Sequence, residues 1–163
     1  MKKIFLYASI ILAAGLLFTN IYNSLVDAKS WANAFPSSVE TARLYYKTSN
    51  PGNFFRLFSP INQLLGLLCI ILFWKAGKKA RLFLLMAIFM YVSADIFTFA
   101  YFYPRNSIIF KADLNGSAEE VKNALQEWSI ANWFRSLIAL AGIIFSSLAL
   151  NTIYKRDFAA DKL

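Results

Sequence analysis

The chain has 163 residues, enough for one domain, and 58% of them are hydrophobic while only 16% are charged. Soluble domains carry about 25% charged residues, so this composition argues against a soluble protein and favours a membrane protein. The sequence contains no histidine and one cysteine, Cys69. These counts exclude an imidazole base, a histidine-based metal site and a disulfide within the chain.

Four apolar runs are long enough to cross a bilayer, which takes ~20 helical residues. They predict an all-α protein, an integral membrane four-helix transmembrane bundle in which residues 1–163 form a single transmembrane domain. The predicted spans cover about residues 4–26, 58–74, 82–103 and 128–154. Ser59 and Pro60 are typical of the start of the second span, and Pro104 is expected to end the third.

Two long polar loops, residues 27–57 and 104–127, separate these spans. Each loop contains the pattern of a short extra helix. The first helix is expected from Ser38 to Tyr46, and the second from Ser117, where Ser-Ala-Glu-Glu resembles a capping box.

The basic residues predict the orientation of the chain. The N-terminus, the connection between the second and third spans, and the C-terminus hold nine Lys or Arg residues, whereas the two long loops are nearly balanced in charge. By the positive-inside rule both termini are cytoplasmic and both long loops lie outside. We therefore predict a protein of the plasma membrane, such as the bacterial cytoplasmic (cell inner) membrane. Its partner is then the lipid bilayer, and the net charge of +8 does not indicate nucleic-acid binding.

Polar side chains within the spans all fall in the predicted outer half of the bundle. They are Asn20, Asn23, Asn62, Gln63, Asp95, Thr98, Asn132 and Arg135. Polar groups in lipid are costly and often mark a functional site. Asp95 and Arg135 have similar depths, so we expect an ion pair between them, either direct or linked through Asn132 or a water molecule.

Helical spacing directs these polar residues to one region. Trp128, Asn132 and Arg135 are spaced i, i+4 and i+7 and therefore share one helix face. Aromatic residues, Trp31 and Tyr103 among them, surround the expected mouth. We interpret the cluster as a pocket for a lipophilic small molecule, although interhelical hydrogen bonds and an interfacial aromatic belt would leave the same pattern. The candidate ligand-binding residues are Trp128, Asp95, Tyr103, Asn23, Gln63 and Trp31.

Two motifs resemble a known family. The segment Trp128-Ser129-Ile130-Ala131-Asn132-Trp133-Phe134-Arg135 resembles the Trp-x-x-x-Asn-x-x-Arg signature of the anthrone-oxygenase-like family, small four-span membrane proteins of mostly unknown function. Tyr103-Pro104-Arg105-Asn106 is similar to the Val-Pro-Leu-Asn element of that family.

The resemblance implies a four-helix membrane bundle and, as in a few members, oxygenation of polyketide anthrones without a cofactor. Carried over to this chain, it makes Arg135, Asn132 and Asn106 candidate catalytic residues, with Trp128 beside them. Members often have histidine after the signature asparagine, where this chain has Trp133. That departure puts an identical acid–base mechanism in doubt.

Three functions stay open at this point, and with them the question of whether the chain is an enzyme. The first is a binding protein or cofactor-independent oxygenase for a lipophilic, phenolic or polyketide-like molecule. The second is a non-enzymatic scaffold or accessory subunit, and the third is a small dimeric transporter. No cofactor and no metal are predicted. Small residues in the third and fourth spans, such as Ala87 and Gly142, would permit helix contacts within or between chains, so an oligomer is also open.

Overall fold

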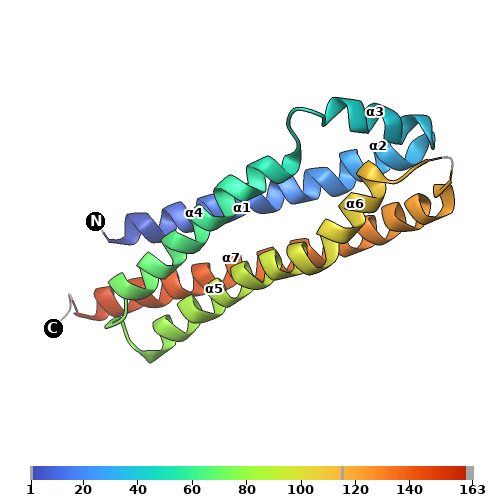
Figure 1. Cartoon of the computed structure of the whole chain (residues 1–163). Coiled ribbons are helices and arrows are strands. Elements are labelled where there is room, and N and C mark those ends of the chain that lie inside the picture. The colour runs from blue at the N-terminus through green and yellow to red at the C-terminus, as the bar shows by residue number, and fades with distance from the viewer. Residues whose placement is uncertain (1, 115, 161–163) are drawn as a thin grey trace.

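The computed structural model describes residues 2–114 and 116–160, and this part of the chain is helical with short connections (Figure 1). The elements, in chain order, are α1 (Lys3–Tyr22), the π-helix η1 (Asn23–Asp27), α2 (Ala28–Asn33), α3 (Ser37–Tyr45), α4 (Pro51–Leu72), α5 (Lys78–Phe97), the π-helix η2 (Thr98–Phe102), α6 (Tyr103–Lys111) and α7 (Ala118–Ala160). The all-α prediction is confirmed.

Four of these helical stretches are long and apolar enough to cross a membrane. They are residues Lys3–Asn33, Pro51–Leu72, Lys78–Lys111 and Ala118–Ala159. Large apolar side chains remain exposed along them, among them Ile11 at 70%, Phe18 at 70% and Phe89 at 61%. A soluble protein rarely exposes so much apolar surface, whereas lipid covers it in a bilayer. The chain is therefore a membrane-embedded protein with four candidate spans.

The helices form a closed four-membered bundle. α7 packs along both α5 and α1, and α4 completes the ring between α1 and α5. Small buried residues such as Ala13, Ala80 and Ala149 line the contacts and let the helices approach closely. Polar bonds add to the packing, since the Ser9 hydroxyl of α1 donates to Asn62 of α4 at 3.0 Å.

Gly142 of α7 gives space to a side chain of α5. A Cβ atom placed there would lie 2.5 Å from the ring of Tyr91, so glycine leaves the space that the ring occupies. The Tyr91 hydroxyl lies 3.0 Å from that of Ser146, one turn further along α7. The tyrosine is therefore held by both packing and a hydrogen bond.

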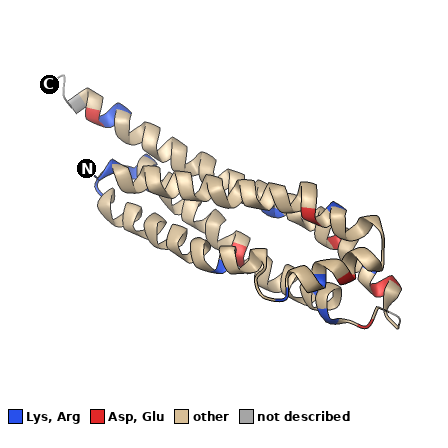
Figure 2. Cartoon of the chain, turned by 90° about the horizontal axis from the view of Figure 1, so that it is seen from above, with Lys and Arg blue, Asp and Glu red and all other residues tan. Residues whose placement is uncertain are grey.

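The bundle has two different ends. Both termini and the connection 73–77 lie at one end, here called the termini end, whereas α2, α3 and α6 lie at the other, the loop end (Figure 1). Lys, Arg, Asp and Glu residues gather toward these two ends (Figure 2). This arrangement suits a bilayer, whose hydrocarbon core excludes unpaired charge. Which end faces the cytoplasm stays a prediction.

The helices extend beyond the predicted spans at the loop end. α4 begins at Pro51 rather than near Ser59, so Pro60 lies inside the helix. The third helical stretch does not stop at Pro104. This proline lies in the first turn of α6, where its missing N–H costs no hydrogen bond within that helix. The π-helix η2 joins α5 to α6 without a break.

The two extra helices expected in the loops have different outcomes. The first is confirmed as α3, from Ser37 to Tyr45. The second is not separate, because α7 runs without interruption from Ala118 to Ala160 and so includes the fourth span. An additional helix, α6, was not expected in the second loop. Polar sequence outside the bilayer stays helical here because it continues helices that are already nucleated.

Gly142→Ala should destabilise the bundle. The added methyl group would overlap the Tyr91 ring, and such overpacking costs about 1–3 kcal/mol. Thermal unfolding in detergent would measure the effect. Gly15→Ala is the matched control, since nothing lies within 4 Å of its Cβ position. Equal melting temperatures for the two variants would contradict the role given to the Gly142–Tyr91 contact.

The predicted orientation can be tested by cysteine labelling. Replacing Cys69, which is 0% exposed, by alanine gives a cysteine-free background. Thr48→Cys at the loop end and Ala159→Cys at the termini end both introduce exposed thiols. A membrane-impermeant maleimide should label the first variant in intact cells and the second only after lysis. The reverse pattern would show that the termini face outward.

Candidate functional site

A cavity of about 770 Å³ lies at the loop end, within the bundle. Ligand pockets usually measure about 300–1,000 Å³, so this cavity can hold a molecule of several rings. Seven of the nine residues predicted as site residues line it: Arg135, Asn106, Trp128, Asp95, Tyr103, Asn23 and Trp31. The other two, Asn132 and Gln63, lie behind the wall and bond to lining residues.

Arg135 is the buried cation of the cavity wall, with 9% of its surface exposed. Its Nη1 donates to the Thr98 hydroxyl at 3.2 Å, and its Nη2 donates to the side-chain Oδ1 of Asn132 at 2.6 Å. Nη2 also donates to the side-chain oxygen of Asn20. Nε is buried and has no hydrogen-bond partner among the described residues. All three partners are neutral, so they solvate the positive charge without cancelling it.

Two phenylalanine rings complete the surroundings of the guanidinium group. Its central carbon lies 4.2 Å from the ring centre of Phe102 and 5.2 Å from that of Phe55. The negative faces of aromatic rings stabilise a cation, and more so where water is excluded. The site is therefore cationic and mostly apolar.

Asp95 of α5 has partners on α4. Its carboxylate accepts hydrogen bonds from the Ser59 hydroxyl at 2.7 and 2.8 Å and from the Gln63 amide at 2.6 Å. Ser59 and Gln63 are four residues apart, so they share one face of α4. Both oxygens of Asp95 are thus held in place, and the carboxylate lines the cavity.

The direct ion pair expected between Asp95 and Arg135 is not formed. The two ion pairs that the structure gives for the described residues are Lys3–Asp157 and Arg105–Glu127. Asn132 bonds to Arg135 but not to the carboxylate. Asp95 bonds to α4, whereas Arg135 bonds to α1, to η2 and to its own helix. Depth along a helix axis does not define the direction around it.

Asn20 and Asn132 clamp α1 to α7. The Asn20 amide donates to the backbone carbonyl of Asn132 at 3.1 Å and to the Ser136 hydroxyl at 2.7 Å. The Asn132 amide donates in return to the backbone carbonyl of Asn20 at 2.9 Å and to the Ser24 hydroxyl at 2.5 Å. Asn132 is 0% exposed, so in this structure it positions Arg135 rather than facing the cavity.

Both π-helices lie beside this polar cluster. η1 carries Asn23 and η2 carries Thr98 and Phe102, all of which line the cavity. A π-turn shifts the register of a helix and is frequent at functional sites. With its amide group turned so that the nitrogen faces acceptors, Asn23 donates to the Asp27 carboxylate at 2.9 Å. The two register shifts thus help to set which side chains face the cavity.

Aromatic residues close the cavity toward the loop end. The indole N–H of Trp128 donates to the Asn106 side chain at 2.9 Å, which joins the two sequence motifs. The Trp128 ring lies 5.2 Å from Trp31 and 5.4 Å from Phe102, both edge to face. Tyr103 is 46% exposed at the edge. Such a wall fits a flat aromatic ligand.

Sequence reasoning missed the charge of the cavity. Four further basic residues line it: Arg43, Lys47, Arg56 and Lys111. Asp95 is the one acidic residue among the lining positions that the structure describes. Arg43 also ties α3 to α6, since its guanidinium donates twice to the Ile109 carbonyl, at 2.6 and 2.9 Å. These residues lie on α3, on the connection that follows it, on α4 and on α6, so only folding brings them together.

Other lining residues could have been found from the sequence. Ser59 lies four residues before Gln63, a spacing that places both on one helix face, but it was interpreted as a cap. Asn20 and Thr98 were recognised as polar positions without being named as site residues. Phe55 and Tyr46 belong to the aromatic residues expected around the mouth, and both line the cavity. Burial, together with the nearby Asp27 carboxylate, raises the pKa of the Tyr46 phenol, which therefore stays neutral at physiological pH.

A family model now identifies the chain. Residues 53–145, more than half of its length, match the anthrone oxygenase family. The chain belongs to this family. The match spans most of α4, then α5, η2, α6 and more than half of α7, and so contains both motifs, Asp95 and Arg135. In searches of the curated proteins and of the solved structures, nothing matches.

The main departure from the family motif lies outside the cavity. Trp133, where members often have histidine, is 44% exposed and is not among the lining residues. Among the described residues no group of three or more His, Cys, Asp or Glu side chains could hold a metal ion. The polar groups that line the cavity include those of arginine, lysine and asparagine, one carboxylate, and serine, threonine and tyrosine hydroxyls.

Asn132→Leu should weaken the bundle. The substitution keeps the volume but removes the amide that bonds Arg135, Ser24 and the Asn20 backbone. Hydrogen bonds between membrane helices contribute about 0.6 kcal/mol on average, so we expect a loss of about 1–2 kcal/mol. Thermal unfolding in detergent measures it. Trp133→Phe, at the exposed neighbouring position, serves as control, and equal melting temperatures would refute the clamp.

Proposed function

We propose that the loop-end cavity binds a lipophilic, aromatic small molecule of phenolic or polyketide-like type. The observation that supports this most strongly is Arg135, a buried cation in the cavity wall whose hydrogen-bond partners are all neutral. A buried charge that has only neutral hydrogen-bond partners and no direct ion pair is costly, and an anionic oxygen on a ligand would offset that cost. A phenolate or an enolate is such an oxygen on an aromatic frame.

The rest of the wall supports the same class of ligand. Trp31, Trp128 and Phe102 present aromatic surfaces, and basic residues surround them. Flat rings stack well on such surfaces, and the positive field favours the deprotonated form of the ligand. The family membership of the chain points in the same direction.

We further propose that the reaction is cofactor-independent oxygenation, with Asp95 as the base. Asp95 takes a proton from the activated methylene carbon of an anthrone-type substrate, and Arg135 stabilises the enolate oxygen that forms. The electron-rich carbanion then reduces molecular oxygen directly. One oxygen atom becomes the new carbonyl group of the quinone, and the other leaves as water with the two methylene hydrogens.

The assignment of the base rests on the composition of the cavity. The sequence has no histidine, and Asp95 supplies the carboxylate among the described lining residues. The bonds from Ser59 and Gln63 hold this carboxylate in one orientation while leaving lone pairs free to accept a proton. Because no ion pair joins it directly to Arg135, the two groups can act on different atoms of one substrate.

A non-enzymatic scaffold or accessory subunit is the second candidate. It is favoured by the extent to which the polar cluster satisfies itself, since Asn20 and Asn132 bond to each other and to Arg135. Under this alternative the cavity would be filled by lipid chains, and the loop end would contact a partner. We also propose the plasma membrane as the location, on the basis of the basic residues at the termini end.

Purified protein in lipid nanodiscs, supplied with a hydroxylated anthrone and oxygen, tests both steps. Quenching of tryptophan fluorescence measures binding, and quinone absorbance with oxygen uptake measures turnover. Arg135→Met should reduce binding and lower turnover by about 100-fold or more, because it removes the charge that stabilises the enolate. Asp95→Asn should retain binding and lower turnover by at least about 100-fold.

Tyr7→Phe is the control, because Tyr7 contacts Tyr154, far from the cavity, in the half of the bundle that carries the termini. Turnover that survives Asp95→Asn would remove the base assignment. Binding without turnover in the unchanged protein would leave a binding protein. Absence of both would favour the scaffold.

A further inference from the structure

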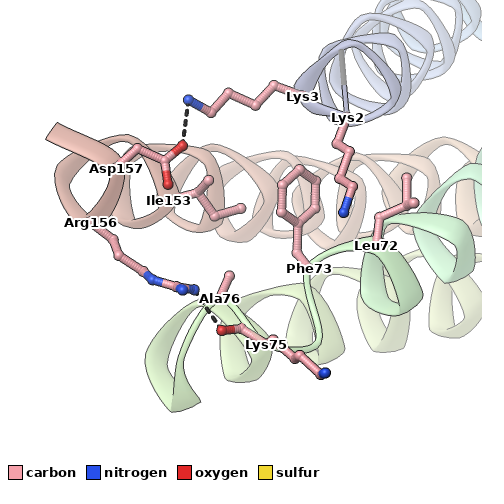
Figure 3. Close-up of a pocket in the computed structure, with 9 residues that line it drawn as sticks. All are labelled: Lys2, Lys3, Leu72, Phe73, Lys75, Ala76, Ile153, Arg156 and Asp157. Atoms are coloured by element: carbon pink, nitrogen blue, oxygen red, sulfur yellow. Dashed lines mark hydrogen bonds and ion pairs between the residues drawn. The ribbon is translucent and has the colours of Figure 1, made fainter. Parts of the chain in front are cut away.

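A second pocket, of about 440 Å³, lies at the termini end, on the opposite side of the bilayer from the cavity (Figure 3). Three separate parts of the chain form it: the start of α1, the end of α4 with the connection that follows, and the end of α7. Its lining residues are Lys2, Lys3, Leu72, Phe73, Lys75, Ala76, Ile153, Arg156 and Asp157.

The pocket holds four cations and one carboxylate. The carboxylate of Asp157 is already neutralised, since the Lys3 ammonium lies 2.7 Å from it. Arg156 is positioned by a 2.6 Å hydrogen bond from its Nη1 to the Lys75 carbonyl oxygen, and both contacts are drawn in Figure 3. This bond uses one of the five donors of the guanidinium group. The excess positive charge is therefore available to a ligand.

Lys2 and Lys75 carry most of this available charge. Within residues 2–114 and 116–160, the structure gives no hydrogen bond or ion pair for either ammonium group. They belong to chain segments that only the fold brings together. Lys2 extends from α1 beside the ring of Phe73 (Figure 3). A single anion near this ring would attract cations from all three segments.

The floor of the pocket is apolar. Phe73, Ala76 and Ile153 are 7%, 8% and 2% exposed, and Leu72 is half-buried beside them. Ile71, the residue before Leu72 on α4, is an apolar side chain that is 72% exposed. The pocket thus adjoins both headgroup charge and hydrocarbon, as an interfacial site for a lipid requires.

We propose that this pocket binds the phosphate group of an anionic phospholipid. Basic pockets between transmembrane helices recognise such headgroups. Inorganic phosphate shares the anionic chemistry, but it makes no use of the apolar floor, so a lipid fits the pocket better. By holding α1, the α4–α5 connection and α7 together, the bound lipid would stabilise the folded bundle. This site is independent of the function proposed for the cavity.

Native mass spectrometry and thermal unfolding in detergent test the proposal. Phosphatidylglycerol should bind as one retained molecule and raise the melting temperature, whereas phosphatidylcholine should do neither. The variant Lys2→Ser/Lys75→Ser should bind phosphatidylglycerol roughly twentyfold more weakly, because each basic residue near such a headgroup contributes about a fivefold gain. Its melting temperature without added lipid gives the check that it folds.

Lys29→Ser/Lys122→Ser is the matched control, since it removes two exposed lysines from the loop end. It should bind phosphatidylglycerol as the unchanged protein does. Equal weakening in both double variants would show a general charge effect and overturn the proposal, as would equal retention of the two lipids. Stabilisation by inorganic phosphate alone, lost in Lys2→Ser/Lys75→Ser, would keep the phosphate site but replace the lipid by the free anion.

Discussion

The structure depends on one buried positive charge. A guanidinium group inside a membrane bundle is stable only if hydrogen-bond acceptors replace the water it has lost. Arg135 obtains them from α1, through Asn20, from η2, through Thr98, and from its own helix, through Asn132. The hydrogen bonds of this one group therefore connect three of the four long helical stretches. Asn20 and Asn132 also bond to each other, so the same two residues hold α1 against α7 and hold the guanidinium group in place.

The same arrangement leaves room for function. Neutral partners stabilise the charge but leave its field intact, and Asp95 is held separately by α4. A direct ion pair would have consumed both groups. Because they lie on different helix interfaces, the guanidinium group of Arg135 and the carboxylate of Asp95 both line the cavity, together with aromatic rings. This separation is the property that a site for an acidic aromatic molecule needs, and it comes from the direction of each side chain around its helix.

The two ends of the bundle differ in their chemistry. At the loop end, α2, α3 and α6 cover a large aromatic cavity, and residues such as Arg43 link these helices by side-chain bonds to backbone. At the termini end the helices close on a small pocket in which basic residues from three segments meet. The bundle thus has a large cavity at one end and a smaller basic pocket at the other.

The sequence alone determined the class of protein, the number of candidate spans and seven of the residues that line the cavity. Apolar runs of sufficient length allow few structures other than membrane helices, and polar residues such as Asn23, Asp95 and Arg135 stood out against them. The pairing of those residues was decided by the tertiary structure, because a sequence shows depth along a helix but not the rotation of one helix against its neighbour. Asp95 consequently bonds to Ser59 and not to Arg135. The basic residues of the cavity, Lys47 and Lys111 among them, are far apart along the chain, and the packing of α3 and α6 over the bundle brings them to the same cavity.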